Sequence, residues 1–266
     1  MKIVIFTYDR FRSATTIPQA AKSGLGYTVL CHAEEQRNNF IALGGVDPAK
    51  IVATGKPRGI AFNRNWAFDN LMADGEWALF LVDDWKRCTE LDTYDQETEP
   101  VLPLTMADNN LYRRKFNTEI DLRQLHHRAE QMTAELDRVG CDLGGFVAHD
   151  NPLFCKKHYT RNVLADGRAW VVRKTALRVD ENIRIIDDYC FSAQQILFGR
   201  GTLVNQWVRP DCYRYSEGAY GSIQKRLPDK LADCAYLVAT YPAAVRIAEK
   251  KNEPAGSHVA IRPKRA

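Results

Sequence analysis

Two adjacent aspartates directly follow an apolar run in this sequence. Residues 77–82, WALFLV, show no polar alternation, and Asp83 and Asp84 come immediately after them. Such a run is typical of a strand buried on both faces of a parallel sheet. Ligands of open α/β sheets bind beyond the carboxyl ends of strands, where two acids would hold a divalent cation or bond a ribose hydroxyl. Taken in isolation, the same residues also fit a strand that stops at a polar turn.

A second pair of adjacent acids, Asp187 and Asp188, stands just before residues 189–198. The spacing of the apolar residues in that segment predicts a helix. Carboxylates at a helix start are stabilised by the helix dipole, which is a sufficient structural reason for this pair. The sequence nevertheless contains two separate pairs of adjacent acids, Asp83–Asp84 and Asp187–Asp188.

Residues 55–65, GKPRGIAFNRN, combine chain-breaking residues with three basic side chains. The helical spacing of residues 66–72 places Arg64 and Asn65 at or near a helix start. The unpaired N–H groups of a helix start and a guanidinium both favour phosphate oxygens, so this segment suits a diphosphate. The sequence contains neither GxGxxG nor a P-loop, which argues against ordinary NAD or ATP sites.

The elements that must position these residues begin with a β-branched strand at residues 2–6, followed by the polar loop Thr7-Tyr8-Asp9-Arg10. A helix over residues 13–22 and strands over residues 27–31 and 51–53 come next, with Glu34 and Glu35 after the second strand. This βαβαβ opening predicts an α/β fold with a Rossmann-like, mostly parallel sheet.

The rest of the chain is predicted from its periodicity and its chain-breaking residues. Residues 89–117 are expected to be loops with one short strand at 101–104, and residues 120–139 form an amphipathic helix. Gly144 and Gly145 fit either a tight turn or a close backbone approach to a ligand. Further strands are expected at 146–148, 169–172 and 202–204, a short helix at 40–43 and another at 228–238, and a basic tail at 241–266 that packs back over the domain.

The overall charge is slight, because 37 Lys and Arg stand against 33 Asp and Glu in 266 residues, giving +4. That balance alone implies no anionic partner. Basic residues do cluster locally, for example at Arg123, His126, His127 and Arg128. Such clusters fit a nucleic-acid footprint, but solvated faces explain most of them.

The seven cysteines lack CxxC pairs and zinc-finger spacing, so neither a disulfide framework nor structural zinc is expected. The apolar run in MKIVIFTYDR is too short for a signal peptide, and no apolar run approaches the roughly 18 residues that a transmembrane helix needs. We therefore expect a cytoplasmic protein with no membrane contact and no obligate protein partner.

The order of these features resembles the nucleotide-sugar glycosyltransferases of the GT-A fold. The similar parts are a first strand ending in T-Y-D-R, an R-N-W segment, an apolar strand ending in acids, and a later R-K-x-x-L-x-x-D-E-x-x-x-x-x-D-D-Y-x-F-S stretch. More narrowly, R-N-W and D-D-Y-x-F are similar to segments of the phage glycosyltransferases associated with TET/JBP-type base oxygenases, which are thought to act on hydroxymethylated pyrimidines in DNA.

The resemblance implies a hexosyltransferase that uses a nucleoside-diphosphate sugar, UDP-sugar above all, with 5-hydroxymethylcytosine in DNA as the favoured acceptor. It implies a single domain over residues 1–266, with a nucleotide-binding half at 1–85, an acceptor half at 86–240 and the tail at 241–266. The nucleotide would lie against Thr7, Tyr8, Arg10 and Glu34 or Glu35, and Arg64 and Asn65 would contact the donor.

The same resemblance assigns the acids. Asp83 would bond the ribose or sugar, and Asp84 would bind Mn²⁺ or Mg²⁺, which bridges the diphosphate. Asp188, beside Asp187, would be the base that deprotonates the acceptor hydroxyl. The chain departs from the usual acid-x-acid triplet, because Val82 occupies the first acidic position. A histidine of the tail often adds a metal ligand in such folds, and His258 is the candidate here.

Three other functions compete with this one. A non-catalytic nucleic-acid-binding module would use the basic and aromatic residues for phosphate contact and stacking. It gains nothing from four aspartates at one sheet edge, which would repel phosphate. A sugar nucleotidyltransferase would need a glycine-rich N-terminal loop, which is missing, and a glycosyltransferase acting on a glycan or a small molecule remains an alternative.

Overall fold

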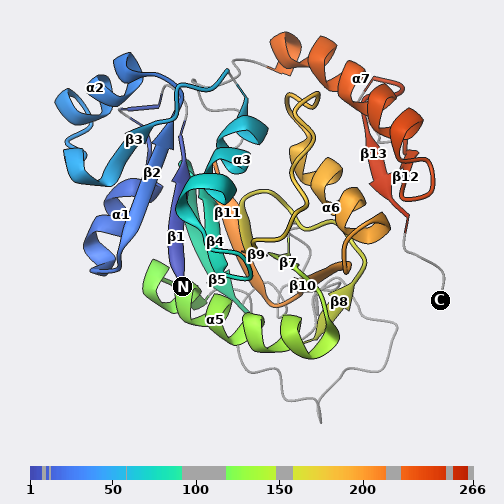
Figure 1. The fold of residues 1–266 in the computed structure, drawn as a ribbon, viewed down its shortest axis with the longest axis horizontal. Helices are drawn as coiled ribbons and strands as arrows, with labels where there is room; N and C mark the ends of the chain where they lie inside the picture. The colour runs from blue at the N-terminus through green and yellow to red at the C-terminus, as the bar shows by residue number, and fades with distance from the viewer. Residues whose placement is uncertain are drawn as a thin grey trace, which may run out of the picture.

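The computed structural model describes residues 1–7, 10–11, 13–57, 59–91, 118–147, 158–213, 223–249 and 254–262. In this part of the chain, six α-helices surround a large mixed sheet of eight strands, with a three-stranded sheet and a two-stranded sheet beside it (Figure 1). None of the described helices has the length and apolar content needed to cross a membrane. The predicted strand at 101–104 lies outside the described residues.

The first half of the large sheet is parallel. Strands β1 (Lys2–Phe6), β2 (Tyr27–Cys31), β3 (Ile51–Ala53) and β4 (Trp77–Val82) stand side by side in the order β3-β2-β1-β4. All three neighbouring pairs run in the same direction. Leu79, Phe80 and Leu81 of β4 are at most 1% exposed, as the unbroken apolar run predicts.

The helices of this half lie on both faces of the sheet. Strands β1, β2 and β3 follow one another across the sheet in the same sense. The helices that connect them, α1 (Thr16–Ser23) and α2 (Glu34–Ala42), therefore pack on the same face. Helix α3 (Ile60–Leu71) returns the chain to β4 on the far side of β1 and packs on the opposite face. Since βαβ crossovers are right-handed, the reversal between β1 and β4 makes this junction the topological switch point.

The second half of the large sheet is mixed, which corrects the expectation of a mostly parallel sheet. Strand β9 (Ala169–Arg173) runs antiparallel to both β4 and β7 (Leu143–Phe146), while β10 (Thr202–Asn205) is parallel to β7 and antiparallel to β8 (Tyr159–Arg161). A fully apolar strand reads the same in either direction, so the local sequence does not specify this reversal. Gly144 and Gly145 lie inside β7 rather than in a turn; a Cβ at Gly145 would meet Ala165 at 2.9 Å.

The remaining elements complete the two faces. Helix α5 (Leu122–Val139) lies in the lower part of Figure 1 and packs with α1 on one face of the large sheet. Helix α6 (Asp187–Leu197) packs with α3 on the opposite face. Strands β11 (Val208–Cys212), β5 (Trp85–Glu90) and β6 (Thr118–Ile120) form the three-stranded sheet, and a 3₁₀ turn covers Pro48–Lys50. At the right of Figure 1, α7 (Ile223–Thr240) and the hairpin of β12 (Val245–Ile247) and β13 (Val259–Ile261) pack against α6.

Helix α3 begins six residues earlier than expected, at Ile60 instead of Trp66. Gly59, with φ 152°, immediately precedes its first residue, and Asn63 and Arg64 are buried within it. The expected placement of Arg64 and Asn65 at a helix start is therefore wrong. The polar residues at 63–65 are buried inside this helix, although polar residues at these positions fit a loop in the sequence.

Candidate functional site

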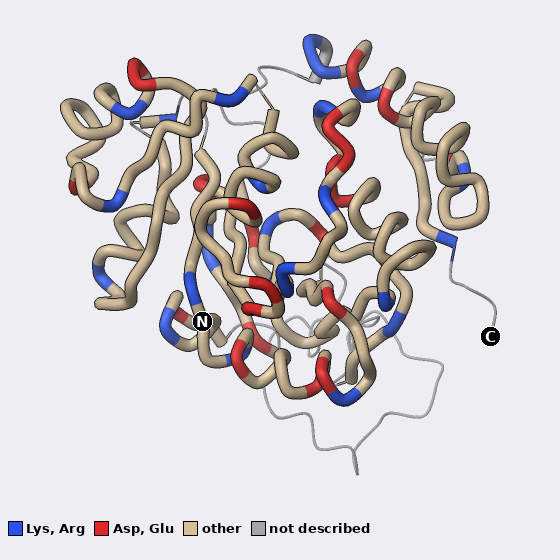
Figure 2. Tube along the Cα trace, in the orientation of Figure 1, with Lys and Arg blue, Asp and Glu red and all other residues tan. Residues whose placement is uncertain are grey.

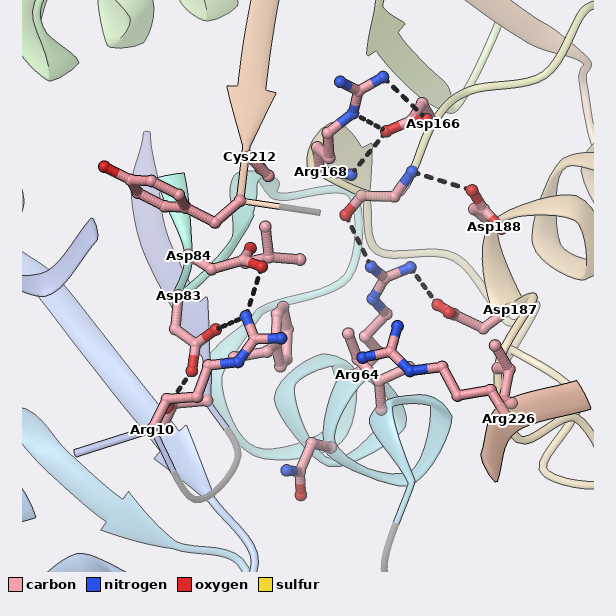
Figure 3. A pocket seen from close by; sticks show the side chains of 18 of the residues that line it. Arg10, Arg64, Asp83, Asp84, Asp166, Arg168, Asp187, Asp188, Cys212 and Arg226 are labelled. Carbon is pink, nitrogen blue, oxygen red and sulfur yellow. Dashed lines mark hydrogen bonds and ion pairs between the residues drawn. The ribbon is translucent and has the colours of Figure 1, made fainter. Parts of the chain in front are cut away.

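A cavity of about 470 Å³ opens at the switch point, beyond the carboxyl ends of β1 and β4. It lies between α3 and the start of α6, and Figure 3 shows its charged lining. The charged residues that line it are Arg10, Arg64, Arg168, Arg226, Asp83, Asp84, Asp166, Asp187 and Asp188. Thus both acid pairs of the sequence reach one cavity, although a hundred residues separate them in the chain.

Asp83 is 4% exposed and is held by two side chains from the loop after β1. The Thr7 hydroxyl donates to its Oδ2 at 2.5 Å, and Arg10 Nη1 donates to its Oδ1 at 3.1 Å. Burial raises the pKa of the Asp83 carboxyl to about 7, although the Arg10 charge and the Thr7 hydrogen bond both act to lower it. The β1 and β4 loops are therefore joined by charge-assisted contacts at the cavity floor.

Asp84 forms an ion pair with the same nitrogen of Arg10 (Figure 3). The Asp84 carbonyl also accepts a hydrogen bond from the backbone N–H of Tyr213, at 3.0 Å. Thr16 fixes the chain on either side of the acid pair, because its hydroxyl donates to the Val82 carbonyl at 2.7 Å and accepts from the Trp85 N–H at 3.0 Å. The positions of both carboxylates are thus set by the start of α1.

Arg64 reaches the cavity from α3 and is only 1% exposed. Its guanidinium lies 3.5 Å from the ring centre of Trp170, a cation–π contact, and donates to the Gly167 carbonyl at 2.9 Å. Its Nη1 forms an ion pair with Asp187. A buried guanidinium requires such a counterion, which assigns Asp187 a charge-balancing place in the fold.

Asp188, the neighbour of Asp187, is bound differently. Its carboxylate accepts hydrogen bonds from the backbone N–H groups of Tyr189 at 2.9 Å and Gly167 at 3.3 Å. No ion pair with an arginine or lysine is found for it among the described residues. Burial, together with the charges of Asp166 and Asp187, raises the pKa of the Asp188 carboxyl to about 7. A carboxyl that is half ionised at neutral pH is suited to accept a proton.

A carboxylate outside the cavity holds the segment that leads into α6. Asp233 of α7 accepts hydrogen bonds from three successive backbone N–H groups, those of Arg184, Ile185 and Ile186, at distances from 2.7 to 3.3 Å. Asp233 is 2% exposed. It therefore fixes the chain immediately before Asp187 and is a positioning residue for the second acid pair.

Several residues predicted for the site lie elsewhere. Asn65 exchanges hydrogen bonds with the backbone of Val179, at 2.8 and 2.9 Å, and does not line the cavity. Glu34 and Glu35 are exposed in the first turn of α2. His258 stacks edge-on with Tyr189, with 6.1 Å between ring centres, and does not line the cavity. Tyr8 lies outside the described residues.

Other lining residues were not predicted from the sequence. Asp166 and Arg168 flank Gly167, and Arg168 Nε donates to Asp166 Oδ1 at 2.6 Å. They reach the cavity because β9 is reversed, so its amino end meets the carboxyl end of β4. Arg226 comes from α7, and His32 from the residue after β2. The one local signal was A-D-G-R before the 169–172 strand, which reads as an ordinary turn.

The described residues do not fit the metal site that the resemblance implies. Both oxygens of Asp83 accept hydrogen bonds, and Asp84 is paired with Arg10, so a guanidinium lies between the two carboxylates. In the described ranges, no three His, Cys, Asp or Glu side chains are grouped so as to hold a metal ion.

The six cysteines that the structure describes are buried and form no disulfide with one another. Cys212 lines the cavity, and burial raises the pKa of its thiol far above the usual value. It is therefore a neutral, inert part of the wall at physiological pH.

Comparison with known proteins does not name a family: no protein-family model matches the sequence, and no curated protein is detectably similar to it.

Proposed function

We propose that this protein is a glycosyltransferase of the GT-A type that moves a sugar from a nucleoside-diphosphate sugar to a hydroxyl. The observation that carries the proposal is the cavity at the switch point, in which two aspartate pairs and four arginines meet. Open α/β sheets bind nucleotides at such a junction. The strands before residue 85 would hold the nucleotide, and the segment from 86 to 240 would present the acceptor.

Asp188 is the base in this mechanism. The acceptor oxygen attacks the anomeric carbon, the bond from that carbon to the phosphate oxygen breaks, and the nucleoside diphosphate leaves with the electron pair. The acceptor proton passes to the Asp188 carboxylate, whose raised pKa of about 7 matches this task. Asp187 is engaged by Arg64, which leaves Asp188 as the partner for the acceptor.

The arginines of the cavity stabilise the negative charge that develops on the leaving nucleoside diphosphate. Arg168 and Arg226 line the cavity from the start of β9 and from α7, on the side of the second acid pair (Figure 3). A guanidinium presents several N–H donors in a plane, which suits phosphate oxygens. A pure nucleic-acid binder would also use arginines, but it has no use for Asp188 with a pKa near neutrality.

The experiment that tests this function is a donor screen. UDP- and GDP-sugars raise the melting temperature when they bind the folded protein, by an amount set by their concentration relative to Kd. A bound donor should then be consumed when a hydroxyl acceptor is added and the released nucleoside diphosphate is measured. A protein that binds no nucleotide sugar at millimolar concentration is not this enzyme.

The favoured acceptor is 5-hydroxymethylcytosine in DNA, on the strength of the R-N-W and D-D-Y-x-F segments; if the protein is phage-encoded, the reaction takes place in the host cytoplasm. If DNA is the acceptor, each phosphate neutralised contributes about 0.9 to the slope of log affinity against log salt. A flat salt response would favour a glycan or small-molecule acceptor.

One basic cluster of the sequence is engaged within the protein. On α5, Arg123 donates to the Ser23 carbonyl at 2.6 Å, Arg128 pairs with Glu90 at 2.9 Å, and the His126 ring contacts the Met1 carbonyl. Figure 2 shows acidic residues among the basic ones along this helix. A DNA footprint is therefore to be sought around the cavity and not on α5.

A further inference from the structure

Arg10 lies between the two carboxylates that follow β4. Its Nη1 reaches Oδ1 of Asp83 at 3.1 Å and also pairs with Oδ2 of Asp84. The three side chains are 9%, 6% and 12% exposed, so water screens this contact little. One guanidinium thus forms ion pairs with two buried carboxylates at the floor of the cavity (Figure 3).

A divalent cation at this place would need the same oxygens. Mg²⁺ binds through about six oxygens at about 2.0–2.1 Å, and Ca²⁺ through roughly six to eight, so the coordinating lone pairs must be available. Here Thr7 occupies one oxygen of Asp83, and Arg10 occupies the other together with one of Asp84. A metal ion would have to displace a positive charge from a buried pair, which is costly.

We propose that Arg10 is the resident cation of the Asp83–Asp84 pair, so that this pair binds no Mn²⁺ or Mg²⁺ and the cavity takes its phosphate ligand without a divalent metal. The part that concerns the ligand rests on the proposed function. The part that concerns the acid pair does not, because it follows from the contacts of Thr7, Arg10, Asp83 and Asp84 alone.

The first experiment measures Mn²⁺ binding directly, by the loss of the free-ion signal in electron paramagnetic resonance, with no nucleotide present. We expect no binding at the pair in the wild-type protein. Arg10→Met removes the positive charge between the two acids, and we expect it to bind Mn²⁺ roughly tenfold or more tightly than wild type, with a melting temperature that rises on adding the ion.

Two further variants serve as controls. Arg10→Lys keeps a positive charge and should show no gain of Mn²⁺ binding. The double variant Arg10→Met/Asp84→Asn removes one of the two carboxylates and should lose the gain. If Arg10→Met folds only when Mn²⁺ is present, that dependence is itself the expected result, since the ion then supplies the missing charge.

The wild-type protein can overturn the proposal even if no Arg10 variant folds. Saturable Mn²⁺ binding by wild type that Asp84→Asn abolishes would show that metal displaces Arg10. If the wild-type protein shows no such binding, the result supports Arg10 as the resident cation of the acid pair.

The second experiment joins the inference to the donor. The UDP-sugar or GDP-sugar found in the screen should raise the melting temperature equally in EDTA and in Mn²⁺. Binding that appears only with Mn²⁺ would overturn the metal-free site while leaving the glycosyltransferase proposal intact. Failure of every nucleotide sugar under both conditions would instead overturn the proposed function, and the direct Mn²⁺ measurement would still decide the place of Arg10.

Discussion

Arg64 and Asp187 form an ion pair that joins α3 to the first turn of α6, with side chains 2% and 7% exposed. Because this contact engages Asp187, the two adjacent aspartates differ in environment although they are identical in type. Asp187 balances a buried guanidinium, and Asp188 faces the cavity with backbone N–H partners.

We expect Asp188→Asn to reduce turnover by roughly 10² to 10⁴, because it removes the base of the proposed mechanism. Donor binding should be nearly unchanged, since the amide keeps the shape of the side chain. Steady-state kinetics, with donor affinity from thermal shift, would measure the two effects separately. Full activity in this variant would refute the mechanism.

The rate should depend on pH through the same carboxyl. Asp188 accepts a proton only when it is ionised, so kcat should rise as pH increases through about 7, where its raised pKa lies. A profile of kcat from pH 5 to 9 measures this. A rate that stays flat from pH 5 to 8 would exclude Asp188 as the base.

The stability of the folded protein should fall with rising pH, whereas kcat should rise. The folded-state pKa of Asp188 lies near 7, above the value of about 3.9 for an unfolded chain, so the native state holds more protons between these values. The contribution of this group to the free energy of unfolding therefore falls as pH rises from about 4 to 7. Asp188→Asn should raise the melting temperature at pH 8 more than at pH 4, and an equal shift at both would contradict the raised pKa.

Breaking the buried Arg64–Asp187 ion pair should lower the stability of the folded protein and not only the rate of catalysis. Asp187→Asn leaves the Arg64 charge buried without a counterion, and removing one partner of such a pair costs about 3–5 kcal/mol. Chemical denaturation would measure the loss. The double variant Arg64→Met/Asp187→Leu should be less unstable than the sum of the two single variants, whereas simple additivity would show that the pair is not coupled.

Gly167 should be intolerant of a side chain. A Cβ there would meet Arg64 Nη2 and the Asp188 Cβ, each at 3.2 Å, so Gly167→Ala should displace the base and lower kcat. The matched control is Gly26→Ala, where a Cβ would have no neighbour within 4 Å and activity should be retained. Equal activity in both variants would show that the wall around Asp188 yields without cost.

The sequence by itself determined the elements with strong local patterns. The apolar and β-branched runs predicted β1, β2, β3 and β4, and the periodicity of residues 120–139 predicted α5, which Asp121 begins with a capping box. It also indicated that the end of β4 should carry a site, because an α/β sheet exposes the carboxyl ends of its strands. Local patterns suffice here, since burial on one or both faces of an element leaves a period in the chain.

Tertiary structure alone decided the direction of β9 and therefore the presence of Asp166 and Arg168 in the cavity. It also decided which way neighbouring polar residues point. Arg64 lines the cavity while Asn65 bonds Val179. Asp187 and Asp188 both line the cavity, but Asp187 pairs with Arg64 whereas Asp188 accepts hydrogen bonds from backbone N–H groups. Adjacent residues of a helix point about 100° apart, so only the packing of α3 and α6 against the sheet decides which partner each of these side chains meets.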